Sequence, residues 1–481
     1  MRCLRWAGST GAACRAVPRS ALPVVAVVPI LWKRCCASGG NCCRAPELAL
    51  GRMTATHVIS PKLRNLSRQR DVYPCNADIA SKRPYPRMPT TEPSSNTTVE
   101  LFCGIGGFRV AADRLGLQTV WANDFSASAC SVYRDRFGLG VLREGDINGL
   151  LETVPPHDIL TGGFPCQPFS AAGKKEGTRD PRGTLFQSIV EVVKKSRPRH
   201  FVLENVKRLL TMEQGAHFAT VLLALTSLDY FVEWRVLNAR HFGLAQNRER
   251  VVLAGTRMDP SVMSPSGIAA HVRLAPGADL ASGPRGITAL LGQPSAWRDV
   301  GRHGSKFSSW GVTFGGKFFA CDLERFSAAL PQVFLKGILE TEPEEQYDFT
   351  QETLERLHMN EAVDRFVQGV EIISNQGGGA RMGYTIFGVG GLAPTLTAST
   401  SRHYERYQVG NRYRRLTPRE YARLQGFADD HCSAASNYDQ YALYGNAVPP
   451  PLVEWVLRQL VHERPTHLDL DDIRQPELFS A

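Results

Sequence analysis

Apolar stretches of strand length alternate with amphipathic stretches of helix length over residues 97–255. The pattern predicts strands at Thr98–Cys103, Thr119–Asn123, Asp158–Thr161, Phe201–Glu204, Phe231–Asn238 and Arg250–Gly255. Helices are predicted at 108–115, Ser126–Phe137 and Leu185–Lys195. Strands separated by helices indicate a parallel α/β sheet, in which functional side chains gather at the carboxyl ends of the strands.

The first 96 residues differ in composition from the rest of the chain. They hold 15 Lys and Arg against four Asp and Glu, so the net charge of +10 belongs to this leader and residues 97–481 are close to neutral. The overall charge is therefore no argument for DNA binding. A basic start with few acids is typical of a transit peptide, and the Pro- and Ser-rich stretch after it is typical of a linker. We expect residues 1–96 to be a disordered leader; the alternative is a start at Met53 or Met88.

The composition of the whole chain excludes several protein classes. Hydrophobic residues make up 43% and charged residues 21%, which fits a globular protein and excludes a disordered or collagen-like chain. No apolar run is long enough to span a membrane. Seven of the 12 cysteines lie in the leader, and the other five are scattered without a CxxC pair, so we predict no metal site. Free cysteines favour an intracellular protein, and the leader leaves the nucleus, a mitochondrion or a plastid as destinations.

The first predicted strand ends in a glycine-rich turn, Glu100-Leu-Phe-Cys-Gly-Ile-Gly-Gly-Phe108. Glycines let the backbone approach a ligand, and the following helix directs N–H groups at it. Asp124 ends the second strand, where a carboxylate can bind ribose, and Asp146 can face an adenine amino group. Arg109 stands where a dinucleotide fingerprint needs Gly or Ala, which favours a nucleoside such as S-adenosylmethionine. A tight turn without a ligand would use the same glycines.

Three further groups are candidates for chemistry. Cys166 lies between two prolines in Gly162-Gly-Phe-Pro-Cys-Gln-Pro-Phe-Ser170, and a cysteine on such a rigid, polar loop is a candidate nucleophile rather than a packing residue. Glu204 ends a strand and can hydrogen-bond to a base ring, or it is a salt-bridged surface acid. Arg248 and Arg250 share one face of a strand, either as a clamp of two guanidinium groups or as an exposed strand face.

These motifs, in this order, resemble the cytosine-5 DNA methyltransferase family. Two later segments complete the likeness: Arg414-Arg-Leu-Thr-Pro-Arg-Glu-Tyr-Ala-Arg-Leu-Gln-Gly-Phe427 and Tyr444-Gly-Asn-Ala-Val-Pro-Pro450. The resemblance implies a Rossmann-like α/β methyltransferase fold that binds S-adenosylmethionine and carries a smaller target-recognition domain. We expect a large catalytic domain over 97–270, a variable and target-recognition region over 271–442, and a C-terminal helix that returns to the large domain over 443–481.

The resemblance also implies a role for each matched residue. Cys166 would be the nucleophile, with Pro165 beside it, and Asn205 would position its loop. Glu204 would contact the flipped cytosine, supported by Arg248 and Arg250. Thr395, in Gly391-Leu-Ala-Pro-Thr-Leu-Thr397, would contact a phosphate. The S-adenosylmethionine site would comprise Phe102, Gly104, Gly106, Asp124, Phe125, Asp146, Ile147 and Asn446.

The implied activity is transfer of a methyl group from S-adenosylmethionine to carbon 5 of a cytosine flipped out of duplex DNA, through a covalent Cys166 adduct. A tRNA cytosine-5 methyltransferase on the same scaffold is the nearest alternative, and Phe164 and Ser170 favour DNA over it. A catalytically silent DNA-binding module is a second alternative, and the presence of Cys166, Glu204 and the arginines disfavours it. The sequence indicates no obligate protein partner and no membrane.

Overall fold

The computed structural model describes residues 96–164, 184–258, 268, 271–275, 287–323, 330–357, 360–375, 385–398 and 405–461. The predicted leader, except for Asn96, lies outside these residues, as do Pro165 and Cys166. Among the described residues, no helix combines the length and the apolar character that crossing a membrane requires.

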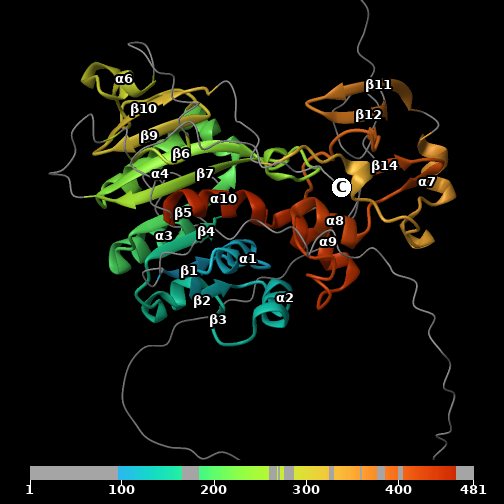
Figure 1. The fold of residues 1–481 in the computed structure, drawn as a ribbon, viewed down its shortest axis with the longest axis horizontal. Helices are drawn as coiled ribbons and strands as arrows, with labels where there is room; N and C mark the ends of the chain where they lie inside the picture. The colour runs from blue at the N-terminus through green and yellow to red at the C-terminus, as the bar shows by residue number, and fades with distance from the viewer. Residues whose placement is uncertain are drawn as a thin grey trace, which may run out of the picture. The chain divides into compact units, whose positions relative to one another are not determined.

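The first half of a ten-stranded sheet is parallel, as predicted (Figure 1). Its strands lie in the order β3-β2-β1-β4-β5, with bounds β1 Thr97–Leu101, β2 Gln118–Asp124, β3 Leu142–Glu144, β4 Ile159–Gly163 and β5 His200–Val206. Helices α1 Gly107–Arg114, α2 Ala127–Phe137 and α3 Thr184–Ser196 follow three of these strands. The order reverses between β1 and β4, and such a reversal is where open α/β sheets bind ligands. The predicted Rossmann-like α/β fold is confirmed.

Alternate residues of the central strands face opposite apolar layers. Leu160 and Leu203 pack in one cluster with α3 and with α4 (Ala216–Thr226), whereas Ile159 and Val202 pack in another with α1 and α10 (Pro450–Val461). Because the side-chain period of a strand is two, a sheet covered by helices on both faces must be apolar at every position. This explains why these strands are continuous apolar runs in the sequence.

The second half of the sheet is antiparallel, an arrangement that the predicted parallel α/β sheet did not include. Strand β7 (Glu249–Arg257) inserts between β5 and β6 (Tyr230–Asn238) and runs opposite to both. Residues 239–248, which join β6 to β7, form one short helical turn, η5 (Ala239–Phe242). A parallel crossover needs about a dozen residues or more, usually with a helix, so this connection dictates an antiparallel pair.

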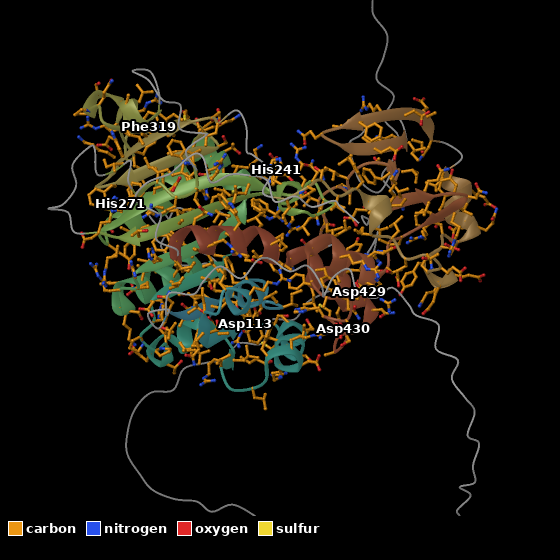
Figure 2. The ribbon with its side chains drawn as sticks, in the orientation of Figure 1. Asp113, His241, His271, Phe319, Asp429 and Asp430 are labelled. Carbon is orange, nitrogen blue, oxygen red and sulfur yellow. The ribbon has the colours of Figure 1, made fainter. Side chains whose placement is uncertain are left out.

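Residues beyond 270 extend the same sheet. Strand β9 (Trp310–Phe314) pairs with β6, and β10 (Lys317–Cys321) and β8 (Arg298–Asp299) follow it outward. Helix α6 (Ile287–Leu291) contributes Leu291 to a cluster with Phe231 and Trp310 that covers this end. Figure 2 labels residues near both ends of β6: His271, whose ring lies 6.2 Å from that of Phe231, and His241, which follows the strand.

A second, five-stranded sheet lies in the order β11-β12-β13-β14-β15. Its strands are β11 Glu361–Val367, β12 Val370–Asn375, β13 Thr385–Phe387, β14 Arg406–Val409 and β15 Arg412–Arg414, and α7 Gln351–Leu357 precedes them. Helices α8 Pro418–Gln425 and α9 Asn437–Asn446 lead to α10, which packs against α1 through Phe108 and Val453. The predicted C-terminal helix Val453–Leu460 lies within α10.

Candidate functional site

The glycine-rich turn after β1 has the open geometry that a bound ligand needs. Phe102, Gly104 and Gly106 all have positive φ (54°, 54° and 82°), which is unusual for Phe102 because its Cβ crowds the backbone there. A Cβ on Gly104 would meet no atom within 4 Å. The Gly104 N–H donates to Asp124 Oδ2 (2.8 Å), so the end of β2 holds the turn that ends β1.

Asp124 and Phe125 lie together at the carboxyl end of β2. The Asp124 carboxylate is buried and also accepts a hydrogen bond from the Ser126 N–H (2.8 Å). Burial raises the pKa of Asp124, although its bonds to backbone N–H groups oppose the shift. The Phe125 side chain is 73% exposed, and an exposed aromatic beside a carboxylate offers a stacking surface for a base.

Asp146 and Ile147, predicted to contact the adenine edge, differ in the exposure of their side chains. Asp146 is exposed, and its Oδ1 accepts a hydrogen bond from the Asn148 N–H (3.0 Å) at the start of a short helical turn. The Ile147 side chain is buried in the core beside the sheet. Any contact that Ile147 makes with a ligand therefore falls to its backbone.

Sequence reasoning missed Glu100, a buried acid within β1. The Tyr133 hydroxyl donates to its Oε2 (3.2 Å), and burial raises the pKa of the carboxyl to about 8. This rise in pKa is opposed by the hydrogen bond from Tyr133, by the charge of Arg109 and by the backbone N–H groups of Phe108 and Arg109. Because those two N–H groups belong to the first turn of α1, the carboxyl group lies at the N-terminus of that helix. The signal was an acid inside an otherwise apolar strand. Because an acidic group occupies this helix end, a nucleoside without phosphates fits the turn better than a pyrophosphate does.

A second constellation lies at the carboxyl ends of β4 and β5. The two strands are parallel neighbours, with Gly163 in register with Glu204, and Cys166 follows Gly163 by three residues. The Asn205 side-chain amide donates to the carbonyl oxygen of Phe164 (2.9 Å), two residues before Cys166. The structure thus brings Glu204 and Asn205 to the strand that leads directly to the predicted nucleophile, while Pro165 and Cys166 lie outside the described residues.

Glu204 forms an ion pair with Arg250 and is largely buried from solvent. Arg250 Nε lies 2.8 Å from Glu204 Oε1, and both side chains are about one-tenth exposed. The other carboxylate oxygen, Oε2, would lie 3.5 Å from a Cβ on Gly163. Arg250 therefore holds one oxygen, and the second faces the strand before Cys166.

The two arginines do not form the single clamp that the sequence suggested. Arg248 is buried, and its guanidinium donates to the backbone carbonyls of Leu396 (3.1 Å), Gly445 (3.0 Å) and Ala447 (2.9 Å). Arg250 instead contacts Glu204. Both arginines lie on one face, as period-two geometry requires, but Arg248 precedes β7 and reaches the segments that pack across the sheet edge. The Arg248 guanidinium therefore holds these backbone segments in place.

The residues before Arg248 join the large sheet to the segment around Thr395. Gln246 is fully buried; its amide donates to Leu424 O (3.2 Å) and its Oε1 accepts from Leu396 N (3.3 Å). The Thr395 hydroxyl, predicted to contact a phosphate, donates a hydrogen bond to the Asn247 carbonyl (2.7 Å). Sequence reasoning missed Gln246; its signal was an amide, able to donate and accept, directly before the arginine pair.

The last motif approaches the first through Val448 rather than through Asn446. Asn446 ends α9 and is exposed. A Cβ on Gly107, by contrast, would clash with the Val448 carbonyl, so α1 and the segment before α10 touch through backbone. Two neighbours of Asn446, Gly445 and Ala447, accept the Arg248 bonds, which links the glycine-rich turn after β1 to the arginine motif.

Comparison with known proteins agrees with this geometry. Residues 96–282 and 320–462 match the model of the family described as C-5 cytosine-specific DNA methylase. The chain is similar to the Type II methyltransferase M.HpaII of Haemophilus parainfluenzae, with 30% identity over 376 residues, 76% of this chain and 90% of that protein. It is 47% identical over 159 residues to M.NgoBI of Neisseria gonorrhoeae, and 45% identical over 159 residues to M.HaeII of Haemophilus aegyptius. The chain matches about half the length of these last two relatives.

A solved structure supports the fold alone. The crystal structure of S. pombe Dnmt2 methyltransferase superimposes with a TM-score of 0.51 at 17% identity, covering 76% of this chain and 98% of that one. At this level of identity the similarity shows that the two proteins share a fold. The substrate has to be argued from the residues of the site.

Proposed function

The chain belongs to the C-5 cytosine-specific DNA methylase family, and on this premise we propose that it transfers a methyl group from S-adenosylmethionine to carbon 5 of cytosine in duplex DNA. One observation carries the proposal: β4 and β5 put Glu204 in register with Gly163, so a buried carboxylate faces the strand that leads to Cys166. The relatives named above, all Type II methyltransferases, support DNA as the substrate class.

The chemistry requires a nucleophile because carbon 5 of cytosine is not nucleophilic by itself. The Cys166 thiolate forms a bond to carbon 6, and Glu204 hydrogen-bonds to or protonates N3, which places electron density on carbon 5. Carbon 5 then takes the methyl group and loses its proton, and the electron pair left behind expels the Cys166 sulfur. A base stacked in a duplex is out of reach of these groups, so it must first be flipped out at a cost of a few kcal/mol.

The neighbours of Glu204 and Cys166 position them for this step. Arg250 fixes one carboxylate oxygen of Glu204 and so orients the other toward β4. Asn205 holds the carbonyl of Phe164, which fixes the start of the Cys166 loop. Asn205 follows Glu204 on β5, and Arg250 lies on β7, the antiparallel neighbour of β5, so adjacent strands of the sheet set this geometry.

The turn after β1 fits S-adenosylmethionine, which supplies an electrophilic methyl group when bound. Gly104 leaves open space for a ligand, Asp124 provides a carboxylate for ribose hydroxyls, and Phe125 provides an exposed ring for adenine. The Glu100 carboxyl at the N-terminus of α1 disfavours phosphate groups there. The site residues therefore suit a nucleoside cofactor that carries no phosphate.

The proposal is tested by expressing the full chain in a bacterial host that lacks cytosine methylation, beside the Cys166→Ser variant. Plasmid DNA and the tRNA fraction are then mapped for 5-methylcytosine. We expect methylated cytosines at a defined DNA sequence with the intact chain, and none with Cys166→Ser. Methylation confined to tRNA, or unmodified DNA from a soluble protein with bound S-adenosylmethionine, would contradict the proposal.

A further inference from the structure

One histidine from late in the chain contacts the glycine-rich turn after β1. His431 lies between α8 and α9, and its Nε2 is 2.7 Å from the carbonyl oxygen of Ile105. Ile105 stands between Gly104 and Gly106, whose positive φ angles shape the turn that the proposed function assigns to S-adenosylmethionine. A side chain from the region predicted to carry target recognition thus reaches the backbone of the proposed cofactor site.

The His431 ring is a neutral hydrogen-bond donor. The side chain is buried, and burial lowers the pKa of His431 to about 4, so the ring is uncharged near pH 7. A carbonyl oxygen only accepts, so the proton of the neutral ring is assigned to Nε2. The ring centroids of Phe427 and Phe137 lie 4.5 Å and 6.1 Å from that of the imidazole, and this packing limits its rotation.

Helix α2 fixes the backbone of His431. Arg136, in the last turn of α2, donates from Nε to the His431 carbonyl (2.9 Å), and its Nη2 lies 3.0 Å from Oδ1 of Asp430, which Figure 2 labels. Phe137, the next residue of the helix, packs on the turn itself, because a Cβ on Gly106 would clash with its ring. His431 and the end of α2 therefore hold adjacent residues of the glycine-rich turn.

Two side chains bond to the turn with opposite polarity. Asp124 accepts from the Gly104 N–H (2.8 Å), and His431 donates to the carbonyl of the next residue, Ile105. Glycine adopts left-handed and right-handed backbone about equally, so a turn built on Gly104 and Gly106 has many conformations available unless it is held. A turn that is already held in its binding conformation loses less conformational entropy when the ligand binds, which raises the affinity.

We propose that His431 is a positioning residue for the cofactor, because its N–H to the Ile105 carbonyl holds the glycine-rich turn in the conformation that binds S-adenosylmethionine. This inference rests on the proposed function and adds to it a residue that acts through the backbone of the turn. Loss of the N–H removes the donor to the Ile105 carbonyl and frees the turn in the protein without cofactor. The loss is therefore expected in cofactor affinity and not in the rate of methyl transfer.

Two substitutions separate the hydrogen bond from the packing. His431→Phe keeps a ring beside Phe427 but has no N–H, whereas His431→Gln keeps an N–H donor near the position of Nε2. Calorimetric titration of the full-chain protein, without DNA, measures its Kd for S-adenosylmethionine. We expect His431→Phe to raise this Kd about tenfold, the scale of one buried hydrogen bond, and His431→Gln to stay within about threefold of the wild type. KM for the cofactor should rise with Kd, and kcat at saturating cofactor and DNA should stay within about twofold.

His157→Phe is the matched control. The His157 side chain is also buried, and its Nδ1 lies 2.8 Å from a backbone carbonyl, that of Pro155. His157 precedes β4, at the edge of the sheet opposite the glycine-rich turn, so its substitution should leave the Kd for S-adenosylmethionine within about twofold of the wild type. A further variant, Arg136→Gln, removes the bond to the His431 carbonyl without changing the ring, and should raise Kd about threefold.

Hydrogen exchange gives a readout that does not depend on methylation. The peptide covering residues 103–108 should exchange faster in His431→Phe than in the wild type when both are free, and equally when both are saturated with S-adenosylmethionine. A wild-type Kd in His431→Phe would overturn the inference, even if urea denaturation shows the variant to be less stable. An equal rise in Kd for His431→Phe and His431→Gln would also overturn it, because packing would then account for the effect.

Two further outcomes are decisive. If His431→Phe does not fold, Arg136→Gln decides the question, and a wild-type Kd in that variant would overturn the inference. Wild-type protein that binds no S-adenosylmethionine would overturn the proposed function and the inference with it, whereas binding that none of the His431 and Arg136 variants changes would overturn the inference alone.

Discussion

Glu204, near the carboxyl end of β5, and Arg250, at the start of the antiparallel β7, meet at the same edge of the sheet. Glu204 and Arg250 form an ion pair that solvent reaches only in small part, and a carboxylate held in this way keeps one orientation. A buried pair adds little net stability, because desolvation offsets most of the attraction. The pair orients the second carboxylate oxygen of Glu204 toward β4, as the proposed contact with the base requires.

Glu204→Gln tests this explanation. The amide keeps the shape, can still accept a hydrogen bond from Arg250 through its oxygen, and can donate an N–H to N3, but it cannot transfer a proton to N3. We expect kcat to fall about 10²–10⁴-fold, the usual contribution of a positioned acid or base, while the affinity for S-adenosylmethionine stays within about twofold. Single-turnover methylation and cofactor titration measure the two effects. Wild-type kcat in this variant would show that Glu204 has no part in catalysis.

Arg248 stands next to this pair in sequence but differs from it in partners. Its three bonds go to backbone carbonyls, and burial together with the charge of Arg250 lowers the pKa of its guanidinium. A lysine ammonium cannot reach three carbonyls in a fixed fork. We therefore expect Arg248→Lys to lower the free energy of unfolding by about 3 kcal/mol, measured by urea denaturation.

The control for Arg248→Lys is Arg208→Lys, the same change at an exposed arginine after β5, which should cost less than about 0.5 kcal/mol. If both variants unfold at the same urea concentration as the wild type, the carbonyl bonds of Arg248 do not hold the segments together. A loss of kcat without a loss of stability would return Arg248 to the role of a substrate cation.

At the scale of elements, strand β1 and helix α1 share a titrating group. Burial raises the pKa of Glu100 to about 8 from an ordinary value of 4.5. The folded chain therefore retains a proton that the unfolded chain releases as the pH rises above 4.5. The stabilisation that this difference gives is complete below pH 4.5 and is lost progressively as the pH rises to about 8.

Glu100→Gln removes this dependence. Between pH 5 and pH 8 the free energy of unfolding of the wild type should fall by about 3.5 kcal/mol more than that of the variant, since each pH unit of a single linked proton is worth about 1.4 kcal/mol. Urea denaturation at the two pH values measures it. Parallel pH profiles for the two proteins would show that Glu100 ionises normally in the folded state.

Most elements of the large sheet could be predicted from the sequence because each is a continuous apolar run between turns. The predicted strands and helices overlap β1, β2, β4 to β7 and α1 to α3. The short connection 239–248 already points to an antiparallel pair, but the insertion of β7 between β5 and β6 could not be predicted, because the order of strands depends on contacts between distant segments. The outward extension by β8 to β10 also escaped prediction, because pairing between distant strands leaves no local pattern.

The candidate site was predictable in part for the same reason. Asp124 ends β2 and Glu204 and Asn205 lie near the end of β5, so all three are at the carboxyl edge of the sheet, where the rule that strand ends form the site expects them. The partners of Arg248 were not predictable, because Leu396, Gly445 and Ala447 offer backbone carbonyls that every residue has. The chemistry of a side chain can be read from the sequence, whereas the backbone carbonyl that a side chain contacts depends on the fold.

At the scale of the whole molecule, one short motif connects the parts that the reaction needs. Gln246, Asn247 and Arg248 bond to the segment 391–397 and to the segment before α10, and Arg250 bonds to Glu204. Val448, in the segment before α10, also touches Gly107 of α1. Hydrogen bonds and one close backbone approach thus join the glycine-rich turn, the acid and the turn before β12 to this motif.

The central claim is that Cys166 forms a covalent bond to a cytosine of DNA during methyl transfer. A duplex with 5-fluorocytosine at the target position tests it directly, because fluorine cannot leave as a proton does and the enzyme stays attached after methylation. The account predicts a DNA-linked protein, formed only with S-adenosylmethionine, whose mass spectrum places the link on the Cys166 peptide. An adduct that persists in Cys166→Ser, or its absence from wild-type protein that methylates the unmodified duplex, would contradict the account.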